Sequence, residues 1–194
     1  MNEEMKEKRN SRQHFIAYLT ERNIKFQEII VEGEYRITTA FTGFYQCPSE
    51  RIEACVFFHK HARAIEARVY YSHPAPEIIK GSEHITELYH LLNWINSNLY
   101  PVNLDHANCS VYSPSYLVNP RWYITEDGGH DIISAVVLDE DLFLAAPLEI
   151  EDYITITLPW IMGELSPFIF WLLTGEIDMD YAIRGINANV LGVW

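Results

Sequence analysis

Histidine is the residue type in this chain most able to carry chemistry, because imidazole acts both as an acid–base group near neutral pH and as a metal ligand. The 8 histidines include His59 and His61, which either share a strand face or flank a turn. No third ligand lies near them in the sequence, so a solvated hairpin tip is favoured over a metal site. Glu87 and His90 have the i, i+3 spacing that carboxylate-bridged di-iron bundles use twice, but Glu-x-x-His occurs here once. We therefore expect no metal and no cofactor.

A second polar group occupies the segment Asp127-Gly128-Gly129-His130-Asp131. Consecutive glycines allow the positive φ angles of a hairpin turn, so a tight turn is favoured over a catalytic loop built on His130 and Asp131. Cys55 lies in an alternating strand whose pattern requires no cationic neighbour, so nothing indicates an activated thiolate. The motifs GxxxxGK(S/T), GxGxxG, GxSxG and HExxH are absent from the sequence. We predict no catalytic residues, and an enzyme is disfavoured.

The charge balance argues against two classes of partner. The 194 residues carry a formal net charge of −13, from 14 Lys and Arg against 27 Asp and Glu. Residues 1–80 hold 12 basic and 11 acidic side chains, whereas residues 81–194 hold 2 and 16. Because nucleic acids and anionic membranes are bound through Lys and Arg, we expect no nucleic acid and no membrane as partner. The acidic clusters indicate a solvated face, or alternatively a surface that steers a basic partner toward an apolar groove.

Length and cysteine content indicate one domain in a reducing compartment. A chain of this size with 48% hydrophobic residues can fill a single core. Cys47, Cys55 and Cys109 are odd in number and unevenly spaced, which fits neither a disulfide framework nor a zinc site. The charged N-terminus has no apolar stretch behind it, so we predict no signal peptide and a cytoplasmic location. We divide the chain into a charged lead (1–10), a single α+β domain (11–175) and a C-terminal extension (176–194).

The apolar segment Ile154–Leu173 is long enough to cross a bilayer. It contains Glu164 near its midpoint, two prolines and no basic flank, so a spanning helix is disfavoured. Apolar residues extend nearly all round it, which is typical of a helix buried on two sides. The favoured interpretation is a core helix. The alternative is an interface with another chain, for which Trp160, Phe168 and Trp171 are the candidate partner-binding residues.

Sequence periodicity predicts the elements of the first half. A helix is expected from an N-cap at Ser11 to about Asn23. Runs of β-branched and aromatic residues predict strands at 24–31 and 35–42, joined by a hairpin. Clean alternation predicts half-buried strands at 51–59 and 62–71, joined at His59-Lys60-His61, with Ile52, Ala54, Val56 and Phe58 on one face of the first of them.

The second half is predicted to begin with a break at Pro74-Ala75-Pro76, followed by an amphipathic helix capped by Ser82 and ended by Pro101. Strands are expected at 107–112, 122–125 and 132–138, the last buried on both faces. A final helix with an acidic first turn after Pro147 is expected to bend at Pro159 and Pro167 and to end at Gly175. This order indicates an α+β fold, an antiparallel sheet with helices packed on one face.

The segment ITELYHLLNWINSNLY at 85–100, with strands on both sides and a long last helix, carries a resemblance to a known family. Its Leu91, Leu92, Asn93, Asn96 and Leu99 resemble the YbjN-like family of bacterial sensory transduction regulators, over about residues 12–174. The resemblance implies a type III secretion chaperone-like fold, α-βββ(β)-α-βββ-α. It also implies a small acidic module, often a homodimer, that binds another protein. It implies no catalytic residues.

The sequence thus favours a non-enzymatic protein-binding or regulatory module that binds another protein, itself or both. One alternative is a small-molecule-binding protein or enzyme with a pocket around His59, His61 or His130. Another is an immunity-type protein whose acidic side chains neutralise a basic partner.

Overall fold

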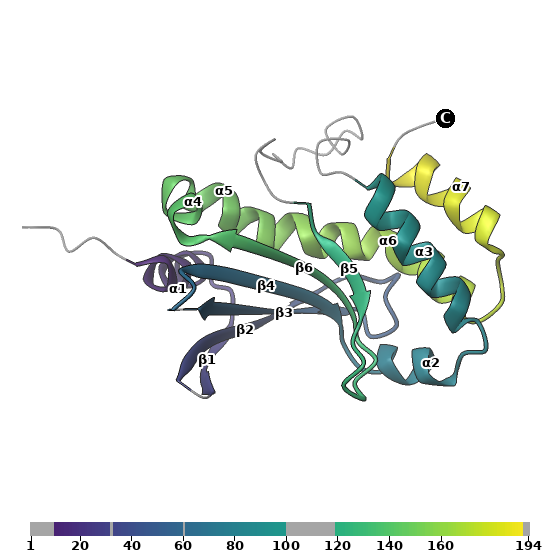
Figure 1. Ribbon diagram of the computed structural model, residues 1–194, viewed down its shortest axis with the longest axis horizontal. Coiled ribbons are helices and arrows are strands. Elements are labelled where there is room, and N and C mark those ends of the chain that lie inside the picture. Colours follow the sequence, from purple (N-terminus) through teal and green to yellow (C-terminus); the bar gives the residue numbers. More distant parts are fainter. Residues whose placement is uncertain (1–9, 32, 60, 100–118, 192–194) are drawn as a thin grey trace, which may run out of the picture.

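A computed structural model describes residues 10–31, 33–59, 61–99 and 119–191 as an α+β fold (Figure 1). Its antiparallel sheet has six strands in the order β1-β2-β3-β4-β6-β5. The strands are β1 Phe26–Val31, β2 Glu34–Thr42, β3 Arg51–His59, β4 Ala64–Tyr71, β5 Arg121–Ile124 and β6 Ile132–Asp139. The helices are α1 Ser11–Glu21, α2 Ala75–Gly81, α3 Ile85–Asn98, α4 Glu140–Ala145, α5 Pro147–Asp152, α6 Leu158–Leu173 and α7 Met179–Asn189.

The predicted alternation of the central strands is confirmed. On β3 the side chains of Ile52, Ala54 and Val56 are fully buried, and on β4 every second residue from Ile65 to Tyr71 is buried. The register pairs Val56 with both Ile37 and Ala67, which places these apolar side chains on one face of the sheet. Strand β6 pairs with β4 and β5, and most of its residues are buried, as predicted for an interior strand.

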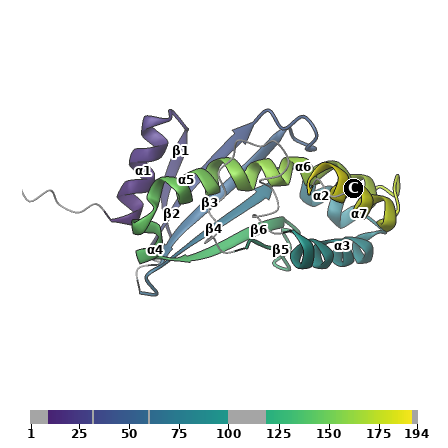
Figure 2. The same ribbon diagram turned by 90° about the horizontal axis from the view of Figure 1, so that it is seen from above.

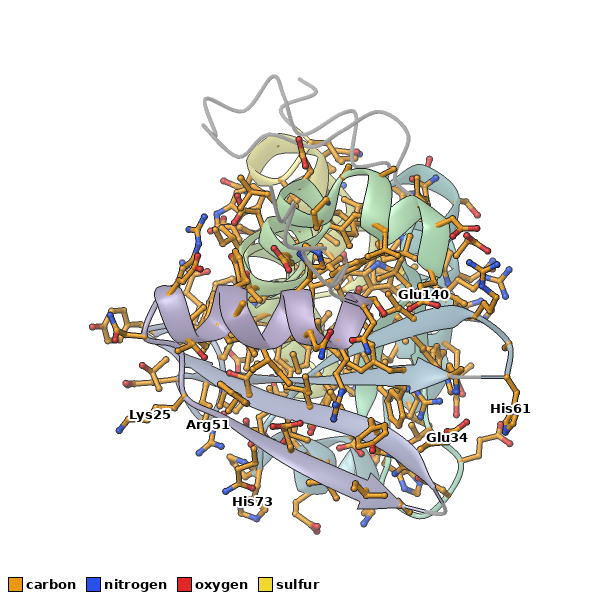
Figure 3. The ribbon with its side chains drawn as sticks, turned by 90° about the vertical axis from the view of Figure 1, so that its left-hand side faces the viewer. Lys25, Glu34, Arg51, His61, His73 and Glu140 are labelled. Atoms are coloured by element: carbon orange, nitrogen blue, oxygen red, sulfur yellow. The ribbon has the colours of Figure 1, made fainter. Side chains whose placement is uncertain are left out.

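The helices form a second layer on that apolar face. In Figure 2 the continuous helical segment from α5 to α6 runs along the sheet, with α1 and α4 near one end and α2, α3 and α7 gathered near the other. Figure 3 shows this layer above the sheet when the molecule is seen end on. The predicted class, an α+β fold with an antiparallel sheet and helices packed on it, is therefore confirmed.

The helical segment Pro147–Leu173 is the one described helix long and apolar enough to cross a membrane, and 72% of its most apolar window is buried inside the fold. It therefore packs as a core helix of a folded domain. Between α5 and α6 the segment Tyr153–Thr157 forms a π-helical turn, which the proline pattern did not indicate. Pro159 lies in the first turn of α6, where a missing N–H costs little, and Pro167 lies in its interior. Gly175 follows its C-terminal end with φ +73°, as predicted.

Several predicted boundaries are wrong by a few residues. The N-cap of α1 is Asn10, whose side chain forms a reciprocal capping box with Gln13, so Ser11 is the first helical residue. His84, not Ser82, precedes α3, and the Ser82 hydroxyl instead donates to the Leu173 carbonyl at 2.6 Å. Helix α2 occupies the segment interpreted as a break, because proline is tolerated in a first turn. Helix α4 was also not predicted.

The C-terminal residues add a helix to the body of the fold. Ala182 and Ile186 of α7 are fully buried and belong to the same hydrophobic cluster as the sheet. Helix α7 contacts both α6 and α3. The division of the chain at residues 10 and 175 stays a prediction about folding units. Three features of the sequence lie outside the described residues: the strand predicted at 107–112, the predicted helix end at Pro101, and Cys109.

Candidate functional site

Helix α6 presents one stripe of residues to solvent. Twelve of its 16 residues are buried, and the other four are Trp160, Glu164, Pro167 and Trp171. These four follow one another at steps of four, three and four residues, so they share one helix face. A helix on the surface of a globular protein usually carries polar residues on this face. Here three of the four are apolar, and Trp171 is 42% exposed.

A groove of about 600 Å³ opens along the C-terminal half of this stripe, between α6, α7 and the loop that joins β2 to β3. Aromatic rings form much of its wall, and one carboxylate lies among them. We name this aromatic groove by its lining residues Tyr45, Glu164, Phe168, Phe170, Trp171 and Tyr181.

The β2–β3 loop holds Tyr45 in place. Phe44 packs so closely on Gly163 of α6 that a Cβ there would come within 2.7 Å of the ring. The Ser166 hydroxyl donates a hydrogen bond to the Gln46 carbonyl at 2.9 Å. Between these two anchors, Tyr45 is 81% exposed. The loop thus presents an aromatic side chain to water although its neighbours are fixed on α6.

Helix α7 forms the opposite wall. The Asp178 carboxylate caps this helix by accepting a hydrogen bond from the Tyr181 N–H at 2.7 Å. A Cβ at Gly185 would overlap the ring of Phe168, so this glycine permits the close approach of α7 to α6. Phe168 is buried and meets Trp171 edge to face, with ring centroids 6.2 Å apart. Tyr181 remains half exposed.

Glu164 is the acidic residue of the aromatic groove. Within the described part of the chain no hydrogen bond or ion pair to this carboxylate is found. Desolvation by the surrounding residues raises the pKa of Glu164 above its ordinary value. A half-buried carboxylate among aromatic rings is a site where a cation would be attracted both by the charge and by the ring faces.

The structure brings together two of the three residues predicted to bind a partner. Phe168 and Trp171 both line the aromatic groove. Trp160 lies on the same stripe but packs against the core and is not among the groove residues. Tyr45 was missed because it lies in a connection far from α6 in the sequence, and Tyr181 because it lies in the tail beyond Gly175, for which no element was predicted. A role in partner binding remains a prediction for Trp160, Phe168 and Trp171.

The predicted histidine pair lies at the turn between β3 and β4. His59 ends β3, with Nδ1 3.0 Å from Glu34 Oε1 and Nε2 3.2 Å from Glu66 Oε2. The hydrogen bond with Glu34, together with that from Glu66, raises the pKa of His59 above its ordinary value. His61 lies in the turn between β3 and β4 and is exposed, and Figure 3 shows it on the same side of the molecule as Glu34.

A pocket of about 320 Å³ lies beside His59, at the end of the sheet where α1 begins. Its polar side chains already make contacts within the chain. The Ser11 hydroxyl donates to Glu140 at 2.7 Å, and the Arg12 guanidinium lies 4.0 Å from the centre of the Tyr35 ring. Figure 3 places Glu140 close to α1. This arrangement leaves His59 as a pocket residue held by two carboxylates.

The face of the sheet opposite the helix layer carries a second set of charges. Phe57 lies between two guanidinium groups, with Arg36 at 4.9 Å and Arg68 at 4.7 Å from its ring centre. Arg68 Nε also donates to Glu66 Oε1 at 2.7 Å. Arg68 is directly opposite Cys55 in the register, a cationic neighbour that the pattern of its own strand does not indicate. Burial nevertheless raises the pKa of Cys55, which keeps the thiol protonated.

The segment Asp127 to Asp131 forms the predicted tight turn between β5 and β6. Gly128 has φ +86°, and the Asp127 carboxylate accepts a hydrogen bond from the Gly129 N–H at 3.1 Å. The Asp131 N–H donates to Thr125 Oγ1 at 3.0 Å. The hydrogen bonds of this segment thus stabilise the turn itself. In the Glu-x-x-His segment of α3, Glu87 Oε1 lies 3.6 Å from His84 Nδ1.

A buried acid lies where α1 packs on α5. Glu151 is 4% exposed, and one of its carboxylate oxygens has no hydrogen-bond partner. Burial, reinforced by the charge of Asp152, raises the pKa of Glu151 to about 8. Next to it, the Tyr18 hydroxyl donates to Asp152 at 2.7 Å, and Arg22 pairs with the same carboxylate at 3.0 Å. Arg22 only partly offsets this rise, because its ion pair is with Asp152 and not with Glu151.

No group of three or more His, Cys, Asp or Glu side chains suited to a metal ion occurs among the described residues. No protein-family model, no curated protein and no solved structure matches the chain. The resemblance to YbjN-like proteins therefore stays a prediction.

Proposed function

We propose that this chain is a non-enzymatic protein-binding module, of type III secretion chaperone-like architecture and YbjN-like family, that docks its partner in the aromatic groove. The observation that supports this most is the apolar solvent stripe of α6. An exposed run of apolar side chains is a common feature of protein interfaces, and Trp and Tyr are the residues most often found at their energetic centres. The partner is another protein, a second copy of the chain, or both.

The fixed positions of the exposed rings also support docking. Tyr45 and Tyr181 are held by anchored neighbours, at 81% and 52% exposure. A side chain whose backbone is already ordered loses less conformational entropy when a partner covers it. The net charge of −13 argues against nucleic acid and an anionic membrane as the occupant. Unpaired thiols at Cys47 and Cys55 agree with a cytoplasmic location.

The test compares three purified full-length proteins: wild type, Tyr45→Ala/Trp171→Ala, and Tyr89→Ala as the matched control. Tyr89 is 48% exposed on α3 and lies outside the aromatic groove. For cross-linking, each protein is expressed in cells of the source organism with a photo-crosslinking amino acid at position 181 or 89. Sedimentation velocity of the purified proteins gives the oligomeric state. We expect specific cross-links from position 181 that fall more than about tenfold in the double variant. Equal cross-linking from both positions, with a monomer throughout, would contradict the proposal.

A second candidate function is favoured by the pocket beside His59, which agrees with the alternative of a small-molecule-binding protein. A native mass spectrum of the purified chain tests it. A retained mass that disappears in His59→Ala would support this candidate, and an unliganded mass in both proteins would count against it. The third candidate, an immunity-type protein, also requires docking of a basic partner, so it shares the surface proposed above.

A further inference from the structure

We infer that the aromatic groove takes an arginine side chain of a partner protein, with the guanidinium against Glu164 and over the rings of Tyr45 or Trp171. The inference rests on the proposed docking function and names the partner chemistry of that same surface. It combines the groove, the exposed rings that line it, and a carboxylate that no described residue neutralises.

The chemistry of the groove selects a cation over an apolar side chain. Glu164 has no ion pair within the described residues, and its carboxylate is half buried between ring-bearing walls. Covering this carboxylate with an apolar side chain would remove its water without providing a hydrogen bond or an ion pair to replace it. A cation compensates this charge, and it also interacts favourably with the faces of Trp and Tyr.

Arginine fits this groove better than lysine. Its guanidinium is planar, so one face can lie on an aromatic ring while its edge donates two hydrogen bonds to a carboxylate. The same chain already shows this preference on the sheet, where Arg36 and Arg68 lie over Phe57. An ammonium group is more strongly hydrated and has no plane to stack.

The distribution of charge favours a different protein over a second copy of this chain. Glu176, Asp178 and Asp180 lie at the junction of α6 and α7, beyond the end of α6 that carries Trp171. After Arg121 the sequence contains one basic residue, Arg184. Two copies meeting through this face would place acidic residues against each other, whereas a basic partner would be attracted and steered toward the groove.

The experiment titrates the full-length protein with N-acetyl-arginine amide and with N-acetyl-citrulline amide, which has the same shape without the charge. Chemical shifts of the indole N–H groups and of Tyr45 report binding. We expect the arginine probe to saturate the Trp171 signal in the millimolar range and to bind about tenfold more tightly than the citrulline probe. Glu164→Gln should reduce this difference severalfold, leaving only the contribution of the rings, and Glu176→Gln, an exposed acid at the junction of α6 and α7, should preserve it.

Three results would overturn the inference: equal affinity for the two probes, an unchanged arginine preference in Glu164→Gln, or no saturation up to about 50 mM. If cross-linking from position 181 still depended on Tyr45 and Trp171, docking would stand and only the arginine assignment would fall. A dimer that dissociates in Tyr45→Ala/Trp171→Ala would instead identify a second copy as the occupant. Loss of position-specific cross-linking would remove the docking proposal itself.

Discussion

The open face of the sheet and the aromatic groove both combine aromatic rings with charges, but they differ in how the charges are neutralised. On the sheet, His59 lies between Glu34 and Glu66, and Arg68 pairs with Glu66 while stacking on Phe57. In the groove, Glu164 has no partner among the described residues. The charges of the sheet face are compensated within the chain, whereas the groove leaves a charge and several rings for another molecule.

This difference indicates what each surface contributes. Ion pairs and cation–π contacts on the sheet add modestly to stability, about 1 kcal/mol or less for each exposed pair. The groove contributes little to the stability of the chain through its exposed rings, because those rings remain in water. Substitutions in the two regions should therefore separate effects on folding from effects on binding.

The largest effect is expected where the groove is joined to the core. Gly185→Ala should lower the free energy of unfolding by about 3 kcal/mol, because its Cβ would overlap Phe168 and push α7 away from α6. Urea unfolding followed by tryptophan fluorescence measures this change. Gly81→Ala is the control, since a Cβ there meets nothing within 4 Å and the residue has no positive φ. A loss in Gly185→Ala no larger than in the control would show that the two helices are not so closely packed.

The buried Glu151 should make stability depend on pH. Its pKa of about 8 in the fold lies above the ordinary value of 4.5, so the folded protein keeps a proton that the unfolded chain releases. The free energy of unfolding should therefore fall as the pH rises from about 4.5 to 8. Glu151→Gln should remove this fall and be more stable than wild type at pH 8 by on the order of 2 kcal/mol. Unfolding curves at several pH values test this, with Glu149→Gln as the control that keeps the wild-type slope.

On the sheet, His59 is a titratable group whose charge is compensated by neighbouring carboxylates, unlike that of Glu151. The pKa of His59 is raised above 6.5 by Glu34 and Glu66, so its stabilisation is complete below pH 6.5 and is lost as the pH rises through the folded pKa. His59→Asn should be about 1 kcal/mol less stable than wild type at pH 5.5, and the difference should shrink at pH 9. Thermal unfolding at both pH values measures it. The same loss of stability at both pH values would mean that the pairing of His59 with the carboxylates is not ionic. The control His61→Asn should leave the free energy of unfolding unchanged at both pH values.

The sequence predicts the sheet better than the groove. The strict alternation of β3 and β4 was enough to assign their buried faces, because this pattern depends on neighbours within one strand. Helix α2 was missed since proline is compatible with a first turn as well as with a break. Phe168 and Trp171 were identified because apolar residues extend nearly all round their helix. Tyr45 and Tyr181 could not be found in this way, because only the packing of Phe44 on Gly163 and of Phe168 on Gly185 brings them to the groove.

The smallest effect on stability, and the sharpest separation of the two regions, is expected at Tyr45. Because its ring is 81% exposed, Tyr45→Ala should change the free energy of unfolding by less than about 0.5 kcal/mol. The adjacent Phe44 packs on Gly163, so Phe44→Ala should cost several times more in the same unfolding experiment. Tyr45→Ala should nevertheless weaken cross-linking from position 181. If Tyr45→Ala were as destabilising as Phe44→Ala, its exposed ring would be a structural residue, and the groove would lose the property that distinguishes it from the sheet face.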